Sequence, residues 1–256
     1  MTRDWDAVAY DRLPIPMTAW GETVLGWLEL TGSERVLDAG CGTGRVTELL
    51  LERLPHGTVV ALDGSEAMIA KARARLGDGR VEYVVADLGA PLPIQHPVDA
   101  ILSTATFHWI PDHDALFANL AAVLRPGGQL AAQCGGAGNI ASIEAALRAM
   151  GEDLAGRKHF ATVEATRARL AAAGFTDIGC WLHDEPTPLS HADLEPYLEA
   201  ICLGDHVEEM SDDERQRFVH EVAARMPAPV IDYVRLNIRA RRTGAREDQG
   251  ATAAGA

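Results

Sequence analysis

The sequence predicts an α/β fold in which helices cover both faces of a doubly wound, mostly parallel sheet. Between residues 35 and 134, short apolar runs alternate with amphipathic segments of about a dozen residues, which is typical of βαβ units. The runs are nearly continuous in apolar residues, as in strands that are covered on both faces. A glycine-rich turn directly follows the first run, at the end of the strand where such sheets bind ligands.

The predicted elements follow this alternation along the chain. A first helix is expected over 17–32, and strands over 35–40, 57–63, 81–87, 98–104 and 128–134 alternate with helices over 44–55, 65–77 and 113–128. Ser65 and Gly77 fit the N-cap and C-cap of their helix. After Cys134 the rhythm changes, and residues 135–139 form a glycine-rich joint.

Beyond the joint, the pattern predicts helices over 142–156, 162–174, 190–204 and 211–226, and a strand over 175–184. Ser211 and Glu214 fit a capping box. The last predicted strand, 233–242, alternates apolar with polar residues, which indicates one wetter face carrying Arg235, Asn237 and Arg239.

Composition narrows the class of partner. The 256 residues carry a net charge of −14, which argues against nucleic acid or an anionic membrane as a partner. No stretch has the pattern of a signal peptide or a bilayer span, so we expect a cytoplasmic protein. The four cysteines are scattered and no His/Cys cluster has zinc spacing, so we expect reduced thiols and no metal.

The segment "VLDAGCGTGR" places Asp38, Gly40, Gly42 and Gly44 at the end of the first predicted strand. Glycines let a ligand touch the backbone and allow φ angles that other residues resist. The register differs from the G-x-G-x-x-G pattern of dinucleotide sites. Asp38 would repel a pyrophosphate, and it suits a ligand with an ammonium group.

Two further acids end the next two strands. A carboxylate at Asp63 can accept hydrogen bonds from both ribose hydroxyls, and Asp87 can accept from an adenine amino group while Leu88 packs on the ring. Each acid alone also fits a plain cap or turn residue. Together they surround one crevice and suit an adenosine with an amino-acid tail and no phosphate, which describes S-adenosylmethionine.

Four segments resemble the class I S-adenosylmethionine-dependent methyltransferases: "VLDAGCGTGRVTELL", "VVALDGSEAMIAKAR", "VEYVVADL" and "DAILSTATFHWIPDHDALFANLAAVLRPGGQLAAQ". More narrowly, the opening "DW…Y", "FHWIPDHDALF", "RLAAAGFTDIGCWLHDEPTPLSH" and "MSDDERQRF" are similar to the trans-aconitate 2-methyltransferase group. The resemblance implies a Rossmann-like sheet of seven strands with the last one antiparallel, an added helical lid, and S-adenosylhomocysteine as product. The predicted cofactor-binding residues are Asp38, Gly40, Gly42, Gly44, Asp63, Gly64, Met68, Asp87, Leu88 and Ser103.

The resemblance divides the chain into an N-terminal lid segment with the first helix (1–30), a cofactor-binding core (31–135), a helical acceptor-binding insertion with the final strands (136–240) and a disordered tail (241–256). His108 is the candidate general base, and it alternatively orients Trp109 or caps the next turn; His113 is expected to be structural. The candidate acceptor-binding residues are Trp5, Tyr10, Trp20, Trp109 and Arg157, with Lys158, His159 and Arg12 as further local cations. The aromatic residues alternatively belong to the core, and the cations to the solvated surface.

The predicted activity is methylation of a small-molecule carboxylate, similar to trans-aconitate, to its methyl ester. A carboxylate is ionised at neutral pH and needs no base, which agrees with the lack of a Ser/His/Asp or Cys/His pattern. The alternatives are O- or N-methylation of a larger metabolite and a protein that binds S-adenosylmethionine without catalysis. The fourth strand ends in "STAT", unlike the motifs of DNA methyltransferases, and the sequence leaves the oligomeric state open.

Overall fold

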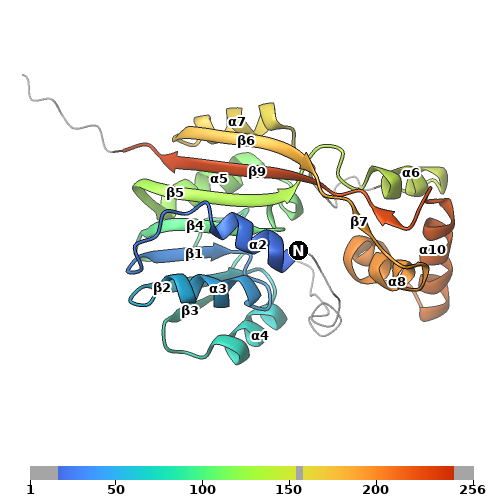
Figure 1. The fold of residues 1–256 in the computed structure, drawn as a ribbon, viewed down its shortest axis with the longest axis horizontal. Helices are drawn as coiled ribbons and strands as arrows, with labels where there is room; N and C mark the ends of the chain where they lie inside the picture. The colour runs from blue at the N-terminus through green and yellow to red at the C-terminus, as the bar shows by residue number, and fades with distance from the viewer. Residues whose placement is uncertain (1–16, 154–157, 245–256) are drawn as a thin grey trace, which may run out of the picture.

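The computed structural model describes residues 17–153 and 158–244, and Figure 1 shows their arrangement. Seven strands form one sheet in the order β3 (Val81–Val85), β2 (Thr58–Asp63), β1 (Arg35–Ala39), β4 (Val98–Thr104), β5 (Leu124–Gly135), β9 (Val234–Arg242) and β6 (Phe175–Asp184). β9 pairs antiparallel with both of its neighbours, and the other pairs are parallel. The prediction of a seven-stranded sheet with its last strand antiparallel is confirmed.

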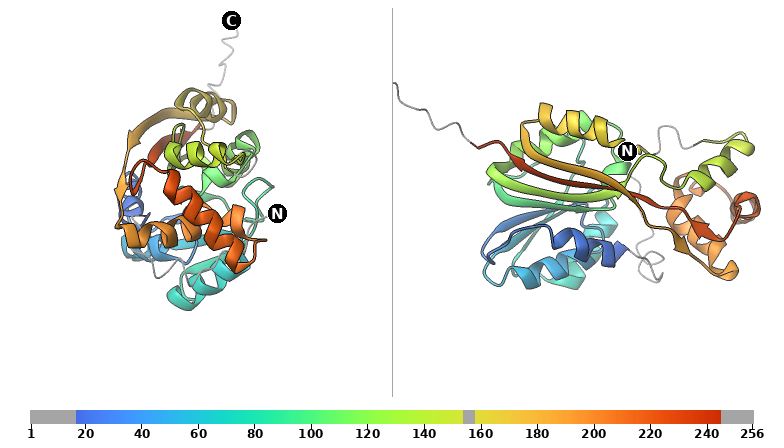
Figure 2. Two further views of the ribbon diagram at one scale, coloured as in Figure 1. Left: turned by 90° about the vertical axis from the view of Figure 1, so that its right-hand side faces the viewer. Right: turned by 45° about the horizontal axis from the view of Figure 1, so that its top comes forward.

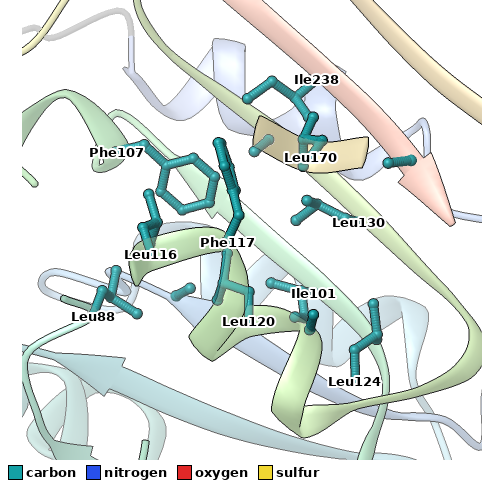
Figure 3. Close-up of a cluster of buried hydrophobic side chains, with 14 of the residues drawn as sticks. Leu88, Ile101, Phe107, Leu116, Phe117, Leu120, Leu124, Leu130, Leu170 and Ile238 are labelled. Atoms are coloured by element: carbon teal, nitrogen blue, oxygen red, sulfur yellow. The ribbon is translucent and has the colours of Figure 1, made fainter. Parts of the chain in front are cut away.

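Helices cover both faces of this sheet (Figure 2, right). On one face, α2 (Met17–Leu25) and α3 (Arg45–Arg53) enclose a core with Val36, Val59 and Leu102, and α4 (Glu66–Leu76) packs beside them. On the other face, α5 (His113–Val123) and α7 (Val163–Ala172) enclose the largest core, where Phe107, Phe117 and Leu120 interlock (Figure 3). The continuous apolar character of the strands follows from this double coverage.

A second, separate core lies beyond the carboxyl ends of the parallel strands (Figure 1). It is formed by what we call the cap, namely residues 141–149 and 187–231. The cap comprises α6 (Ala141–Ala149), β7 (Thr187–Pro188), α8 (His191–Tyr197), a π-helical turn (Leu198–Cys202), α9 (Gly204–Val207), α10 (Asp212–Arg225) and β8 (Val230–Ile231). Trp20 and Tyr233, from outside the cap, also pack into its core.

Hydrogen bonds join three of the segments that connect the sheet to the cap. The middle segment leads into β9: the carbonyl of Val234 accepts from the Gly136 amide at 2.9 Å, and that of Asp232 accepts from the Ile140 amide at 3.0 Å. On its other side, the Tyr233 carbonyl accepts from the Glu185 amide at 2.8 Å. The connections after β5 and β6 are therefore both bonded to the connection before β9.

Several boundaries differ from the predicted ones for local reasons. α2 ends at Leu25 instead of residue 32, and α6 ends at Ala149 ahead of Gly151, whose φ is 81°. α5 ends at Val123 and β5 begins at Leu124, because Pro126 disfavours helical geometry in the residue before it. The helix expected over 190–204 contains Pro196 and breaks into three parts.

The strand predicted over 233–242 is present as β9, which ends at Arg242, but one expectation for it was wrong. The face that alternation marked as wet is covered at Arg235 and Asn237, which are 2% and 0% exposed, while Arg239 is exposed. The predicted cap residues Ser65, Gly77 and Ser211 take their expected positions, and Ser211 forms the capping box with Glu214.

Candidate functional site

The glycine-rich turn after β1 is shaped by left-handed backbone at three positions. Gly40, Gly42 and Gly44 have φ values of 85°, 54° and 83°, which side chains strongly disfavour. A Cβ on Gly40 would lie 2.1 Å from Oγ1 of Thr106, so the turn is packed directly against the loop after β4. A Cβ on Gly42 would meet nothing within 4 Å. The turn thus presents bare backbone to open space at Gly42.

Asp38 places a buried carboxylate beneath this turn. The residue is 1% exposed, and its Oδ2 accepts a hydrogen bond from the Thr47 hydroxyl at 2.6 Å. Burial, with a smaller contribution from nearby Asp63, raises the pKa of Asp38 to about 6. Its Oδ1 is buried and has no hydrogen-bond partner among the described residues. Such an atom calls for a donor that a ligand would bring.

Asp63 and Asp87, the other two predicted acids, lie in different environments. Asp63 accepts from the amides of Gly42 and Ser65, both at 2.9 Å, and burial raises its pKa against these hydrogen bonds. It therefore joins the glycine turn to the start of α4. Asp87 is exposed and accepts from the Gly89 amide at 2.8 Å, forming a local turn. Of the three acids, Asp38 and Asp63 lie close enough together for Asp63 to raise the pKa of Asp38.

The remaining predicted cofactor residues surround these groups. Gly64 links Asp63 to Ser65, whose hydroxyl accepts from the Met68 amide at 3.2 Å. Ser103 is buried and donates to the Ala39 carbonyl at 2.6 Å, which ties β4 to β1. The side chain of Leu88 lies in the core under α5, as Figure 3 shows. These residues, which were predicted to contact the cofactor, therefore also make contacts within the fold.

His108 lies in a 3-10 turn, Phe107–Trp109, after β4. Its Nδ1 accepts from the Gly135 amide at 3.3 Å, and its ring stacks on Phe160 with centroids 5.9 Å apart. Burial lowers its pKa well below the usual value, with Arg235 and Lys158 adding to the effect. The imidazole is therefore neutral at ordinary pH and is a weak base.

The structure brings some of the predicted acceptor residues to this place. Trp20 is 7% exposed and packs in the core of the cap, and the ring of Trp109 lies 4.8 Å from Nζ of Lys158. His159 donates its amide to the His108 carbonyl at 2.8 Å. The ring of His113 bonds to the Phe107 carbonyl at 2.9 Å, in keeping with a structural role. The remaining predicted residues, Trp5, Tyr10, Arg12 and Arg157, lie outside the described residues and stay predictions.

Arg235 is a buried cation near His108 whose burial the sequence did not reveal. It begins the covered stretch of β9, and its guanidinium carbon lies 4.3 Å from the centre of a Trp20 ring. In the sequence it is one arginine of an alternating strand, a pattern that does not distinguish a buried arginine from an exposed one. To predict the burial of Arg235, one would have to know that Trp20, more than 200 positions away in the sequence, packs against it.

Within residues 17–153 and 158–244, no group of three or more His, Cys, Asp or Glu side chains has an arrangement that could hold a metal ion. No helix in these ranges is both long and apolar enough to cross a bilayer.

Comparison with known proteins identifies the family. Residues 36–128 match the model of the family described as "Methyltransferase domain". A trans-aconitate 2-methyltransferase of Methylobacterium nodulans is 34% identical over 181 residues, which cover 70% of this chain and 67% of that relative. The chain belongs to the class I S-adenosylmethionine-dependent methyltransferases. Within them, the chain falls in the trans-aconitate 2-methyltransferase-like group.

Two further matches define the extent of the likeness. A trans-aconitate 2-methyltransferase of Variovorax paradoxus is 41% identical over 130 residues, or 51% of this chain. The chain spans about half the length of that relative, 49%. A solved N-methyltransferase of Haemonchus contortus, in complex with S-adenosylhomocysteine, shares the fold with a TM-score of 0.60 at 21% identity, covering 89% of this methyltransferase and 53% of that chain.

The residues at the crevice fit S-adenosylmethionine, the cofactor of this family. The unpartnered Oδ1 of Asp38 can accept from an ammonium group, and the open space at Gly42 admits a ligand against the backbone. Asp63 lies at the end of β2, where a carboxylate can accept from ribose hydroxyls. A phosphate would need cationic or donor groups, whereas the carboxylates of the buried Asp38 and the half-buried Asp63 lie here, so the ends of β1 and β2 suit a cationic ligand.

Proposed function

We propose that this protein transfers a methyl group from S-adenosylmethionine to a carboxylate of a small molecule similar to trans-aconitate, giving a methyl ester. The proposal rests on one combination of features. The carboxylates at the ends of β1 and β2 suit a cationic ligand, and the loop after β4 has no strong base among the described residues, because the pKa of His108 is lowered. The names of the relatives support the choice of acceptor.

In this proposal the residues of the crevice bind and orient the cofactor. Asp38 accepts from its ammonium group through Oδ1, Asp63 accepts from the ribose, and Asp87 accepts from the adenine amino group at the rim. Gly40 and Gly44 keep the turn in its left-handed shape so that Gly42 can contact the ligand. The crevice lies at the carboxyl ends of β1 and β2, where parallel sheets present their ligands.

The acceptor side of the site favours a nucleophile that is already ionised. When bound, S-adenosylmethionine supplies a methyl group on a positively charged sulfur, and an ionised carboxylate oxygen can take it without losing a proton. His108, with its lowered pKa and its Nδ1 occupied by the Gly135 amide, serves to position the loop after β4. The chain then contributes alignment and exclusion of water, which are large terms in such transfers.

The overall charge of the protein also bears on its partners. A net charge of −14 opposes binding to nucleic acid, so we propose a small-molecule acceptor. The cytoplasmic location stays a prediction from the sequence. The anionic acceptor would be held by local cations, of which Lys158 and Arg235 lie close enough to lower the pKa of His108.

A product assay tests this proposal. The full chain is incubated with S-adenosylmethionine and a panel of carboxylic acids that includes trans-aconitate, and products are analysed by mass spectrometry. We expect a gain of one methyl group that is lost on mild alkaline hydrolysis, as for an ester. The Asp63→Ala variant is the control, because its weakened cofactor binding should lower product formation at limiting S-adenosylmethionine.

Two outcomes would contradict the proposal. Methylation of alcohols or amines but no carboxylate would show a different acceptor class, in which His108 would become the candidate base. Tight binding of S-adenosylhomocysteine with no methyl transfer to any acid would indicate a protein that binds the cofactor without this catalysis.

A further inference from the structure

We propose that the guanidinium of Arg235 is the binding site for a carboxylate of the acceptor that is not methylated. The inference rests on the proposed function, and it deepens it by requiring an acceptor with at least two carboxylates. One would receive the methyl group, and the other would keep its charge and bind Arg235 before and after the transfer.

The position of Arg235 is suited to this role. β9 runs antiparallel to β5, so its start lies at the carboxyl end of the parallel strands, on the side that faces the cap (Figure 1). Arg235 is paired with Gly135, whose amide donates to His108. The guanidinium is therefore placed between the loop after β4 and the cap, at the same edge as the glycine turn.

Arg235 is buried and lacks a counter-ion. It is 2% exposed, and no carboxylate of the described residues forms an ion pair with it. Glu185 is the one carboxylate that influences its pKa, with the smallest contribution, and Glu185 is itself bonded to His183 at 3.0 Å. A buried arginine without an anion is costly to a fold, so its presence calls for a reason.

The guanidinium is held in one orientation, with one nitrogen left available. Its Nε donates to Oε1 of Gln133 at 3.3 Å, and Gln133 is fixed in turn by donating to Oδ1 of Asn237 at 2.9 Å. Its Nη2 is buried and has no hydrogen-bond partner among the described residues. A guanidinium that is fixed on one edge and unpartnered on another is preorganised for an anion, and a carboxylate matches its geometry.

Aromatic rings enclose the same group. The guanidinium carbon lies 4.3 Å from the centre of a Trp20 ring and 5.9 Å from that of Tyr233, whose hydroxyl bonds to that of Tyr197 at 2.9 Å. These walls exclude water and strengthen any charge pairing formed there. A purely structural cation–π contact would explain the rings. It would not explain the buried Nη2 without a partner.

The test compares a tricarboxylate with a monocarboxylate on the same scaffold. The full chain, saturated with S-adenosylhomocysteine to prevent turnover, is titrated by calorimetry with trans-aconitate and separately with crotonate. In the Arg235→Gln variant we expect trans-aconitate to bind roughly 10- to 100-fold more weakly, as for a lost hydrogen bond to a charged group, and crotonate to bind as in the parent protein.

Matched variants separate binding from folding. Arg239→Gln removes an exposed arginine of the same strand and should leave both affinities unchanged. Arg235→Lys keeps the charge without the planar fork and should recover part of the trans-aconitate affinity. If Arg235 only joined the sheet to the cap, its variants would lower the melting temperature and would weaken both ligands together.

The outcomes also distinguish this inference from the proposed function. Unchanged trans-aconitate affinity in a folded Arg235→Gln variant would overturn the role of Arg235, even if the enzyme makes methyl esters. Selective loss of trans-aconitate in that variant, together with no ester formation by the parent protein, would support the anion site and overturn the proposed activity. Equal affinity of the parent protein for both acids would overturn the requirement for a second carboxylate.

Discussion

The two halves of the site bury charges of opposite sign. At the ends of β1 and β2 the groups are acids, the buried Asp38 and the half-buried Asp63, which lie on segments that follow each other closely in the chain. Beside the cap the group is a buried cation, Arg235, which contacts Trp20 and Gln133 from two distant segments. On the function proposed above, this difference gives an acidic protein one site for a cationic ligand and another for an anionic one.

The largest effect on cofactor binding is expected when Asp63 is replaced. Replacing this half-buried acid by alanine removes the acceptor of the Gly42 amide and the proposed acceptor of the ribose, so cofactor affinity should fall by about 1.5–3 kcal/mol. Asp87→Ala removes an exposed acid that competes with water, and it should cost under about 1 kcal/mol. Calorimetric titration with S-adenosylhomocysteine measures both. Equal losses would mean that burial does not set the strength of the acids.

A pair of glycine variants tests whether the crevice itself holds the ligand. Gly42 and Gly127 both have positive φ, 54° and 76°, and a Cβ on either would meet nothing within 4 Å. Alanine at either position should lower the free energy of unfolding by about 1–2 kcal/mol. Because the new methyl group would occupy the ligand's place only at Gly42, cofactor affinity should fall there by roughly 10- to 100-fold. Loss of affinity in both variants would point to a general effect on the fold.

The titration of Asp38 gives a pH dependence with opposite signs for binding and folding. Its pKa is raised from 3.8 to about 6, so between these values the folded state holds a proton that the unfolded state releases. Folding stability from this group is therefore greatest below pH 3.8 and is lost as the pH rises through 6. The cofactor ammonium needs the ionised carboxylate, so affinity should fall by up to about tenfold per unit below pH 6.

The Asp38→Asn variant, whose side chain cannot ionise, tests this pH dependence. Affinity for S-adenosylhomocysteine is measured from pH 5 to 7.5 in the parent protein and in Asp38→Asn. The variant should bind more weakly at neutral pH and show a flatter profile. An identical slope in both proteins would assign the pH dependence to another group.

The smallest effect is expected at His108, on the acceptor side. His108→Asn keeps an acceptor for the Gly135 amide, and with a carboxylate acceptor kcat should stay within about threefold because no proton is removed. A general base would instead contribute about 100-fold or more. Initial rates at saturating cofactor, with the melting temperature as control, decide between these roles.

The contrast between the halves also explains what the sequence could predict. The cofactor side was predictable because its groups follow directly from contiguous motifs: a glycine turn after a strand places Asp38 and Gly42 whatever packs elsewhere. The number of strands and the antiparallel β9 followed from the family resemblance, whereas the order of the strands was not predicted. Burial was harder to predict. In the structure Asp87 is exposed, whereas Leu88 lies in the core under α5.

The acceptor side was poorly predictable for a physical reason. Alternation in β9 indicated a wet face, but Trp20 and the residues of the cap cover Arg235 and Asn237. Whether a polar residue on a strand is exposed depends on elements that pack from elsewhere in the chain, and local pattern contains no trace of them. The predicted helix boundaries were wrong where one proline affects the local backbone, as in the segments that contain Pro126 and Pro196.

The three hydrogen-bonded connections between the sheet and the cap have a mechanical consequence. A hinge needs a segment that can bend alone, yet residues 232–234 are bonded to a neighbour on either side. A rigid swing of the whole cap would have to break several backbone bonds at once. Access of an acceptor to Arg235 must then come from small local openings, and the amides of Gly136, Ile140 and Glu185 should be among the slowest to exchange with deuterium.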